Sequence, residues 1–190
     1  MHGGIAAALL MLLALSACAT SSVSPEKAVA SAVPGPGETP NADGIHPYQG
    51  ELLQCVPYAR EISGIDITGD AWSWWEGSLG KYQRGHLPRF MSVLVLSRTE
   101  RLKLGHVAVV VDILGAREIR VTHANFGSDP VSRRIIYDSM PVIDVSLAND
   151  WSLVRFWNYD LRAWGIVYEA SGFIYPERMG TVTAGPVPTS

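Results

Sequence analysis

The sequence predicts one α+β domain in which N-terminal helices pack on an antiparallel sheet. Three observations favour this class. The chain has 190 residues and 47% apolar content, enough for one ordinary core. Helical patterns come first along the chain and strand patterns follow, without the alternation that parallel βαβ units require. The strand patterns are rich in β-branched and aromatic residues, which pack well on a pleated surface.

Residues 1–18 are interpreted as an export signal that is not part of the fold. Residues 5–15 form an unbroken apolar run, too short to span a bilayer but as long as a signal-peptide core. The run ends in Leu15-Ser16-Ala17-Cys18, which resembles a bacterial lipobox, where the cysteine is acylated. We expect a lipid on Cys18 that anchors the protein in the cell envelope. Ala19 is compatible with the periplasmic face of the outer membrane, and an ordinary secretory signal is the alternative.

The predicted domain covers residues 46–177 and has a flexible segment on each side. Residues 19–45 are rich in Ser, Ala, Pro and Gly and show no periodicity, so we expect a disordered tether. Residues 178–190 have a similar composition and are expected to form a flexible tail.

The first helix is predicted over Gln54–Ser63. Pro57 is tolerated only in the first turn of a helix, and Gly64 supplies a C-terminal stop. This assignment places Cys55 at the helix N-terminus.

A second helix and a series of strands are predicted after it. The helix begins at Asp70 and places Trp72, Trp75 and Leu79 on one face, which we expect to join the core. The predicted strands are Phe90–Leu96, Gly105–Leu114, Arg117–Asn125, Arg133–Tyr137 and Leu153–Trp157. A C-terminal strand and wrapping extension, from residues 154–158 to 172–176, are expected to help close the core.

Cys55 is a candidate nucleophile. The chain has two cysteines, and a lipid on Cys18 would leave Cys55 without a disulfide partner. A thiol reacts as the thiolate, and a helix N-terminus favours an anion by about 0.3–1 kcal/mol. The same backbone N–H groups are suited to hold the oxyanion of a tetrahedral intermediate. The alternative is a buried cysteine that packs as a small apolar residue.

His106 and His123 lie on neighbouring predicted strands and are the candidates for a general base. If Gly115-Ala116 forms a two-residue hairpin loop, His106 faces Asn125 with Cβ atoms about 4.5–5.5 Å apart. His123 is then a diagonal neighbour at about 7–8 Å. This geometry favours Asn125 as the residue that orients the His106 ring. A bulge or a longer loop would place His123 opposite instead.

Other interpretations of these residues stay open. A strand histidine is often only hydrogen-bonded, and Asn125 is also a common turn residue. Cys55, His106 and His123 are all competent zinc ligands, but they show no ordered ligand spacing, so we expect no metal and no other cofactor. The net charge of −3, without a long basic run, argues against a nucleic-acid partner.

Four segments in order resemble the CHAP domain, the cysteine- and histidine-dependent amidohydrolase/peptidase branch of the papain-like fold. They are Gln54-Cys55-Val56-Pro57-Tyr58-Ala59, Gly69-Asp70-Ala71-Trp72-Ser73-Trp74-Trp75, Gly105-His106-Val107-Ala108-Val109-Val110 and His123-Ala124-Asn125-Phe126. The chain departs from the family pattern at two positions. His123 stands where the family often has Glu, and Met91 replaces the usual Gly before the first core strand.

The resemblance implies a papain-like CHAP fold and a monomeric peptidoglycan hydrolase. The bond cut would join muramic acid to L-alanine, or would be a peptide bond of the stem or cross-bridge. Cys55 would attack the carbonyl, and His106 would take the thiol proton and return it to the leaving amine. Asn125, or alternatively His123, would hold the imidazole.

Gln54 and Tyr58 are expected to serve the oxyanion or the substrate. Two other functions fit the same residues. One is a catalytically weak wall-binding or scaffolding lipoprotein that keeps the fold. The other is a thiol acyltransferase, or an amidase that acts on a different substrate.

Overall fold

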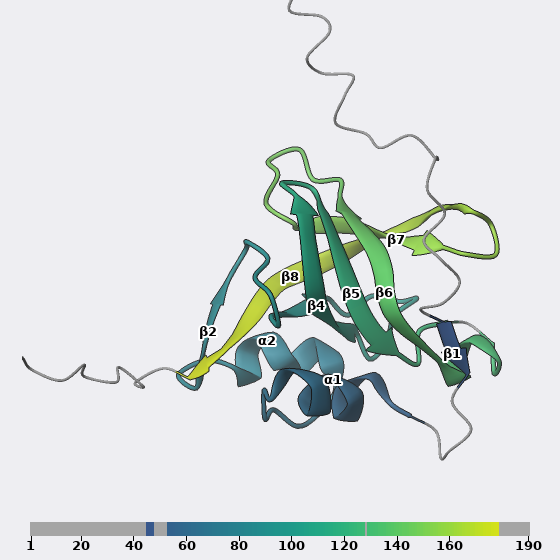
Figure 1. Ribbon diagram of the computed structural model, residues 1–190. Coiled ribbons are helices and arrows are strands. Elements are labelled where there is room, and N and C mark those ends of the chain that lie inside the picture. The colour runs from purple at the N-terminus through teal and green to yellow at the C-terminus, as the bar shows by residue number, and fades with distance from the viewer. Residues whose placement is uncertain (1–44, 48–52, 128, 179–190) are drawn as a thin grey trace, which may run out of the picture. The chain divides into compact units, whose positions relative to one another are not determined.

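Six antiparallel strands close into a β-barrel in the computed structural model, which describes residues 45–47, 53–127 and 129–178 (Figure 1). Around the ring, β3 pairs with β4, then β5, β6, β7 and β8 follow, and β8 returns to β3. The strands are β3 Val93–Leu96, β4 His106–Gly115, β5 Glu118–Ala124, β6 Ile135–Asp144, β7 Leu153–Asn158 and β8 Ala163–Arg178. Two short strands pair outside the ring, β1 (Ile45–Pro47) with β6 and β2 (Tyr82–Gly85) with β8.

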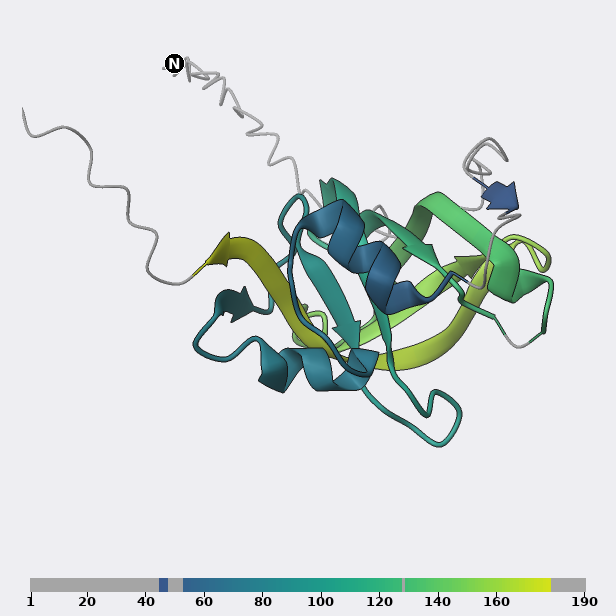
Figure 2. The ribbon, with the colours of Figure 1, turned by 90° about the horizontal axis from the view of Figure 1, so that it is seen from below.

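The predicted α+β class, with helices packed on a sheet, is therefore wrong, because the described part of the chain is mostly β and its sheet closes on itself. Closure depends on β7, which pairs with both β6 and β8. A closed ring leaves no long unpaired edge. The helical segments are short, namely α1 Cys55–Ser63, the 3₁₀ turn η3 Ala71–Ser73, α2 Trp74–Gly77 and the 3₁₀ turn η4 Ser132–Arg134. Figure 2 shows α1 and α2 outside the barrel.

The first predicted helix is confirmed at both ends. α1 begins at Cys55, with Gln54 as an extended N-cap residue, and runs to Ser63. Gly64 ends the helix in the left-handed conformation, with φ 72°, and its N–H donates to the Arg60 carbonyl at 3.0 Å. The glycine thus has the conformational role that the sequence predicted for it.

The second helix begins near Asp70 as predicted, but it buries a different face. Its first turn is the 3₁₀ turn η3, which has about three residues per turn and so shifts the angular positions that follow. Trp74 is fully buried, whereas Trp72 is 40% exposed and Leu79 is 64% exposed. The predicted core face is therefore wrong for Trp72 and Leu79, whereas Trp75 is half-buried and packs against the core.

The five predicted strands all overlap observed strands. β6 is longer than predicted and extends beyond Tyr137 to Asp144. The short strands β1 and β2 were not predicted. The C-terminal extension is the 16-residue strand β8, which buries Phe173 and Tyr175 in the core.

The core has two layers, one on each face of the barrel wall. Alternate residues of all six strands fill the interior, including Leu94, Ala108, Val121, Met140, Phe156 and Phe173. The intervening residues of β3 and β4, such as Val95 and Val107, pack outward against Ala59 of α1 and against Trp74. Successive side chains of a strand point to opposite faces, so β4 separates the two layers.

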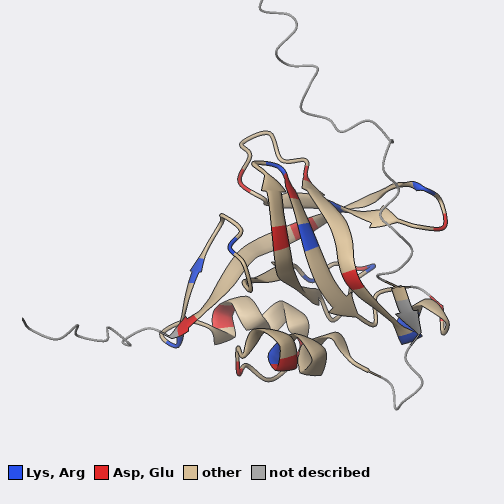
Figure 3. Ribbon diagram, in the orientation of Figure 1, with Lys and Arg blue, Asp and Glu red and all other residues tan. Residues whose placement is uncertain are grey.

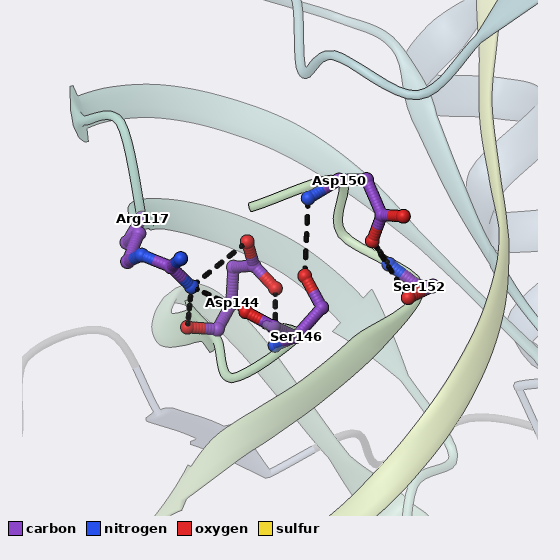
Figure 4. Close-up of polar contacts among 5 residues, drawn as sticks. All are labelled: Arg117, Asp144, Ser146, Asp150 and Ser152. Atoms are coloured by element: carbon purple, nitrogen blue, oxygen red, sulfur yellow. Dashed lines mark hydrogen bonds and ion pairs between the residues drawn. The ribbon is translucent and has the colours of Figure 1, made fainter. Parts of the chain in front are cut away.

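A polar network ties the β4–β5 turn to the loop between β6 and β7 (Figure 4). Arg117 donates to the fully buried carboxylate of Asp144 at 3.3 Å and to the Ser146 carbonyl at 2.8 Å. The Asp144 carboxylate also accepts from the Ser146 N–H, and Ser146 Oγ accepts from the Asp150 N–H. Asp150 in turn accepts from Ser152. Each polar group in this network has a partner, so the burial of Asp144 is compensated.

Several predictions fall outside the described residues. These concern the export signal, the lipid on Cys18, nearly all of the predicted tether, and the tail beyond Arg178. Within the described ranges, no helix combines the length and the apolar character needed to cross a membrane.

Candidate active site

Cys55 is the first residue of α1 and carries a free, partly buried thiol. Backbone N–H groups of Val107, Val56 and Cys55 itself hydrogen-bond to the thiol and lower its pKa. Burial has the larger effect and raises the pKa of Cys55 above its ordinary value. The thiol is therefore protonated near neutral pH, and a nucleophilic attack by its sulfur needs a base.

Gly105 places His106 at the first position of β4. Its φ of 66° is left-handed, and a Cβ at this position would lie 2.6 Å from the Trp72 nitrogen and 2.8 Å from the Leu96 carbonyl oxygen. Only glycine fits such a close approach of three backbone segments. The result is that β4 starts directly against η3, with the Trp72 N–H donating to the Leu104 carbonyl at 3.1 Å.

His106 and His123 form a buried pair, called here the histidine pair. Nε2 of His106 lies 3.1 Å from Nδ1 of His123, within hydrogen-bond distance. The rings meet edge to face, with centroids 5.1 Å apart. The side chains are 2% and 1% exposed, respectively. On its other side, Nε2 of His123 lies 3.2 Å from Sδ of Met140.

Aromatic side chains enclose the histidine pair. Phe126 lies against His106 with ring centroids 4.4 Å apart, and Tyr137 stacks on His123 at 5.1 Å. Phe156 meets His123 edge to face at 5.6 Å. Burial lowers the pKa of His106 to about 3 and holds the pKa of His123 well below its ordinary value. Both imidazoles are therefore neutral at physiological pH, which is the form that accepts a proton.

The surroundings of the pair contain few charges. In Figure 3 the ends of β4 and β5 near α1 are uncharged, whereas the other halves of these strands carry both signs. Residues 106–111 and 121–124 include no Asp, Glu, Lys or Arg. Among the described residues, no carboxylate hydrogen-bonds to either imidazole. The third position of the predicted catalytic set is thus occupied by a neutral group.

Asn125 hydrogen-bonds to Gln54 rather than to His106, although the predicted register is correct at this end of the hairpin. Val109 pairs with Thr122 and Val110 with Val121, a register that would place His106 opposite Asn125. However, Asn125 has a φ of 56°, and its Nδ2 donates to Gln54 Oε1 at 2.7 Å. The left-handed backbone ends the alternation of the strand. The diagonal neighbour His123 reaches the His106 ring instead.

The hairpin turn also differs from the predicted one. Gly115 pairs with Glu118, so the turn residues are Ala116 and Arg117 rather than Gly115 and Ala116. Two register shifts in β4 follow, one between Val110 and Asp112 and the other near the turn. Such bulges change the pairing by one residue each. Together they restore the predicted register where the histidines lie.

Gln54 and Tyr58 both connect α1 to β5. The Tyr58 hydroxyl lies 2.7 Å from Thr122 Oγ1, and Gln54 accepts the hydrogen bond from Asn125. Burial raises the pKa of Tyr58, so its hydroxyl stays protonated. The two contacts hold the N-terminal half of α1 over the strand that carries His123. Their predicted roles toward an oxyanion or a substrate remain predictions.

Cys55 and His106 lie on opposite faces of β4. Cys55 packs with the outer layer, where Val107 also points, whereas His106 shares the interior face of Ala108. Within the described residues no hydrogen bond joins the Cys55 sulfur to the His106 ring. The thiol instead interacts with the backbone N–H of Val107, the residue that follows His106 in the sequence. The described ranges also contain no group of three or more potential metal ligands.

Two residues of this site were missed by sequence reasoning. Thr122 and Met140 carry no local signal, because their partners depend on how α1 docks and on the β5–β6 register. In that register Val121 pairs with Met140 and His123 pairs with Tyr137 across a shift. Met140 also lies in the part of β6 that was not predicted.

Comparison with known families identifies the domain. Residues 46–125 match the family model for the CHAP domain. The chain contains a CHAP domain. CHAP domains are typically amidohydrolases or peptidases, which supports an enzyme and is consistent with peptidoglycan as substrate. No curated protein matches the chain.

The segment that matches the CHAP domain includes Cys55, His106, His123 and Asn125. It ends after β5, so β6, β7 and β8 lie beyond it. Those strands complete the barrel and supply Met140 to the environment of the histidine pair.

Proposed function

We propose that this protein is a peptidoglycan hydrolase that cleaves an amide or peptide bond, with Cys55 as nucleophile and His106 as general base. The observations that support the proposal are a buried, neutral histidine pair and a thiol at a helix N-terminus that is close to the N–H of Val107, the residue after His106. A protonated thiol and a neutral imidazole are the reactants of a general-base mechanism.

The reaction begins when Cys55 Sγ attacks the carbonyl carbon of the substrate. The thiol proton passes to Nδ1 of His106, because Nε2 of this ring is engaged by His123. His106 then gives the proton to the leaving amine nitrogen as the carbon–nitrogen bond breaks, which leaves a thioester on Cys55. Water attacks the thioester, and His106 takes a proton from that water. The carbon–sulfur bond then breaks, His106 returns this proton to Cys55 Sγ, and the acid product leaves.

The N-terminus of α1 is suited to stabilise the oxyanion of this reaction. The Cys55 and Val56 N–H groups already point toward the sulfur. A carbonyl attacked by that sulfur brings its oxygen close to the same groups. Removal of one preorganised oxyanion donor, an asparagine side chain, costs about 2.7–4 kcal/mol in a well-studied hydrolase.

The test uses purified peptidoglycan and analysis of the released fragments by mass spectrometry. The wild-type protein is expected to release fragments, and Cys55→Ala is expected to release none. His106→Gln should slow release by a factor on the order of 10²–10⁴, the usual contribution of a general base. His86→Gln is the matched control, because His86 is exposed and should leave the rate unchanged.

The fragments also separate the possible bonds and functions. A free L-alanine amino group marks cleavage next to muramic acid, whereas shortened stems or opened cross-bridges mark a peptidase. Wall left intact by wild-type protein at several pH values and under reducing conditions contradicts the proposal and favours a scaffolding role. Cys55-dependent activity on another acyl substrate favours an acyltransferase or a different amidase.

We also propose that a lipid on Cys18 anchors the domain at the periplasmic face of the outer membrane. The support is the apolar run and the lipobox-like Leu15-Ser16-Ala17-Cys18. Wild-type protein should incorporate labelled palmitate and fractionate with membranes. Cys18→Ala should incorporate none. Unlabelled wild-type protein in a lipoprotein-processing host would contradict the anchor.

A further inference from the structure

Met140 lies in the interior layer of the barrel and touches the histidine pair through its sulfur. Its side chain is 4% exposed, and Sδ lies 3.2 Å from Nε2 of His123. A thioether sulfur accepts hydrogen bonds and has no proton to donate. A hydrogen bond between these two atoms therefore requires the proton to be on Nε2 of His123.

The proton on this nitrogen determines the state of the second ring. A neutral imidazole carries one N–H, so Nδ1 of His123 has a lone pair. This lone pair faces Nε2 of His106 at 3.1 Å, which must then be the donor. His106 is neutral as well, so its Nδ1 carries no proton.

We propose that Met140 is a positioning residue whose sulfur fixes both imidazoles in the tautomer that leaves Nδ1 of His106 as the proton acceptor. The catalytic consequence rests on the proposed function, whereas the tautomers themselves do not. Met140 acts on His106 through His123, across two contacts of 3.1 and 3.2 Å.

The opposite tautomer of the pair is disfavoured by the same contacts. It would direct the lone pair of Nε2 of His123 at the lone pairs of the Met140 sulfur. It would also make Nε2 of His106 an acceptor and place a proton on Nδ1, where the thiol proton must arrive. His123 is 1% exposed and enclosed by aromatic rings, so water is poorly placed to compensate.

The direct test is ¹⁵N NMR of the full-length protein labelled at histidine, in which two-bond couplings distinguish the Nδ1–H and Nε2–H tautomers. Signals are assigned from His106→Gln and His123→Gln. Both rings of the wild-type protein are expected to be protonated at Nε2. Met140→Leu keeps the size but removes the acceptor, so His123 is expected to populate Nδ1–H.

Two further variants separate loss of the acceptor from loss of packing. Met140→Gln offers an amide oxygen at a similar distance and should keep the wild-type tautomers. Val142→Ala, two residues along the same interior face, removes core volume but no contact to the pair, so it should also keep them.

The kinetic readout is the split between kcat and KM on peptidoglycan fragments. Met140→Leu is expected to lower kcat on the order of tenfold with KM unchanged, and Met140→Gln should recover most of the loss. A wild-type His123 protonated at Nδ1 overturns the inference even if the protein cleaves peptidoglycan. Wild-type protein with the expected tautomers but no Cys55-dependent cleavage contradicts the proposed function alone. If Met140→Leu does not fold, the spectra of the wild-type protein and of Met140→Gln still show which nitrogen of each histidine carries the proton.

Discussion

Gly105 shows how one backbone position fixes the site. The residue lets β4 begin between the Trp72 nitrogen and the Leu96 carbonyl, and the next residue is the candidate base His106. An added methyl group would meet backbone atoms on both sides, and the left-handed φ penalises any L-side chain by about 1–2 kcal/mol.

Gly105→Ala is accordingly expected to reduce the free energy of unfolding by at least about 2 kcal/mol, since backbone atoms must move in addition to the strain. Urea denaturation of the two proteins measures the difference. Gly115→Ala is the control, because the added methyl group would enter open space with no neighbouring side chain or strand within 4 Å. Its effect should be within about 0.5 kcal/mol. Equal stabilities for Gly105→Ala and wild type would contradict this view of the turn.

Met91 adopts a left-handed backbone where the CHAP pattern usually has glycine. Its φ is 64°, and its N–H donates to the Val110 carbonyl at 2.8 Å. The turn before β3 therefore uses a backbone conformation that glycine adopts without strain.

At the scale of elements, prediction was accurate where the signal was local. Pro57 and Gly64 define α1 because each restricts its own backbone, whatever the rest of the fold does. The β-branched run of β4 marks a strand for the same reason. The 3₁₀ turn at η3 was not visible in the sequence, and it moved Trp72 to the surface in place of Trp74.

The histidine pair was predicted in part. The register placed His106 and His123 on one face of neighbouring strands, which is how their rings meet. His106 has its hydrogen-bond contact with His123 rather than with Asn125, because strand alternation stops where Asn125 becomes left-handed. The contact of Met140 with His123 could not be predicted from the sequence, since it depends on the β5–β6 pairing across a register shift.

At the scale of the whole molecule, barrel closure was the main feature that the sequence did not reveal. It depends on β7 pairing with both β6 and β8. Such pairings join segments with no mutual signal along the chain. Closure also creates the enclosed interior in which the two imidazoles are desolvated.

This desolvation makes the stability of the barrel depend on pH. The pKa of His106 is about 3 in the folded protein against an ordinary 6.5, so between these values the unfolded chain binds a proton that the folded chain does not. Stability therefore falls as the pH falls through this window, by up to about 1.4 kcal/mol per pH unit. His123 adds an effect of the same sign.

Urea unfolding at pH 7, 5.5 and 4.5 measures how steeply the free energy of unfolding changes with pH. His106→Gln should reduce this slope relative to that of the wild-type protein. A slope that His106→Gln does not alter would show that His106 is not the group that titrates.

The length and position of β8 determine when the barrel closes during folding. This strand of 16 residues is the last one described along the chain, and it pairs with β2, β3 and β7. Every residue of the candidate site is synthesised earlier. Until β8 pairs with β3 and β7, the ring of strands stays open at this position. The candidate base therefore becomes enclosed only after this last described strand has paired with both of its barrel neighbours.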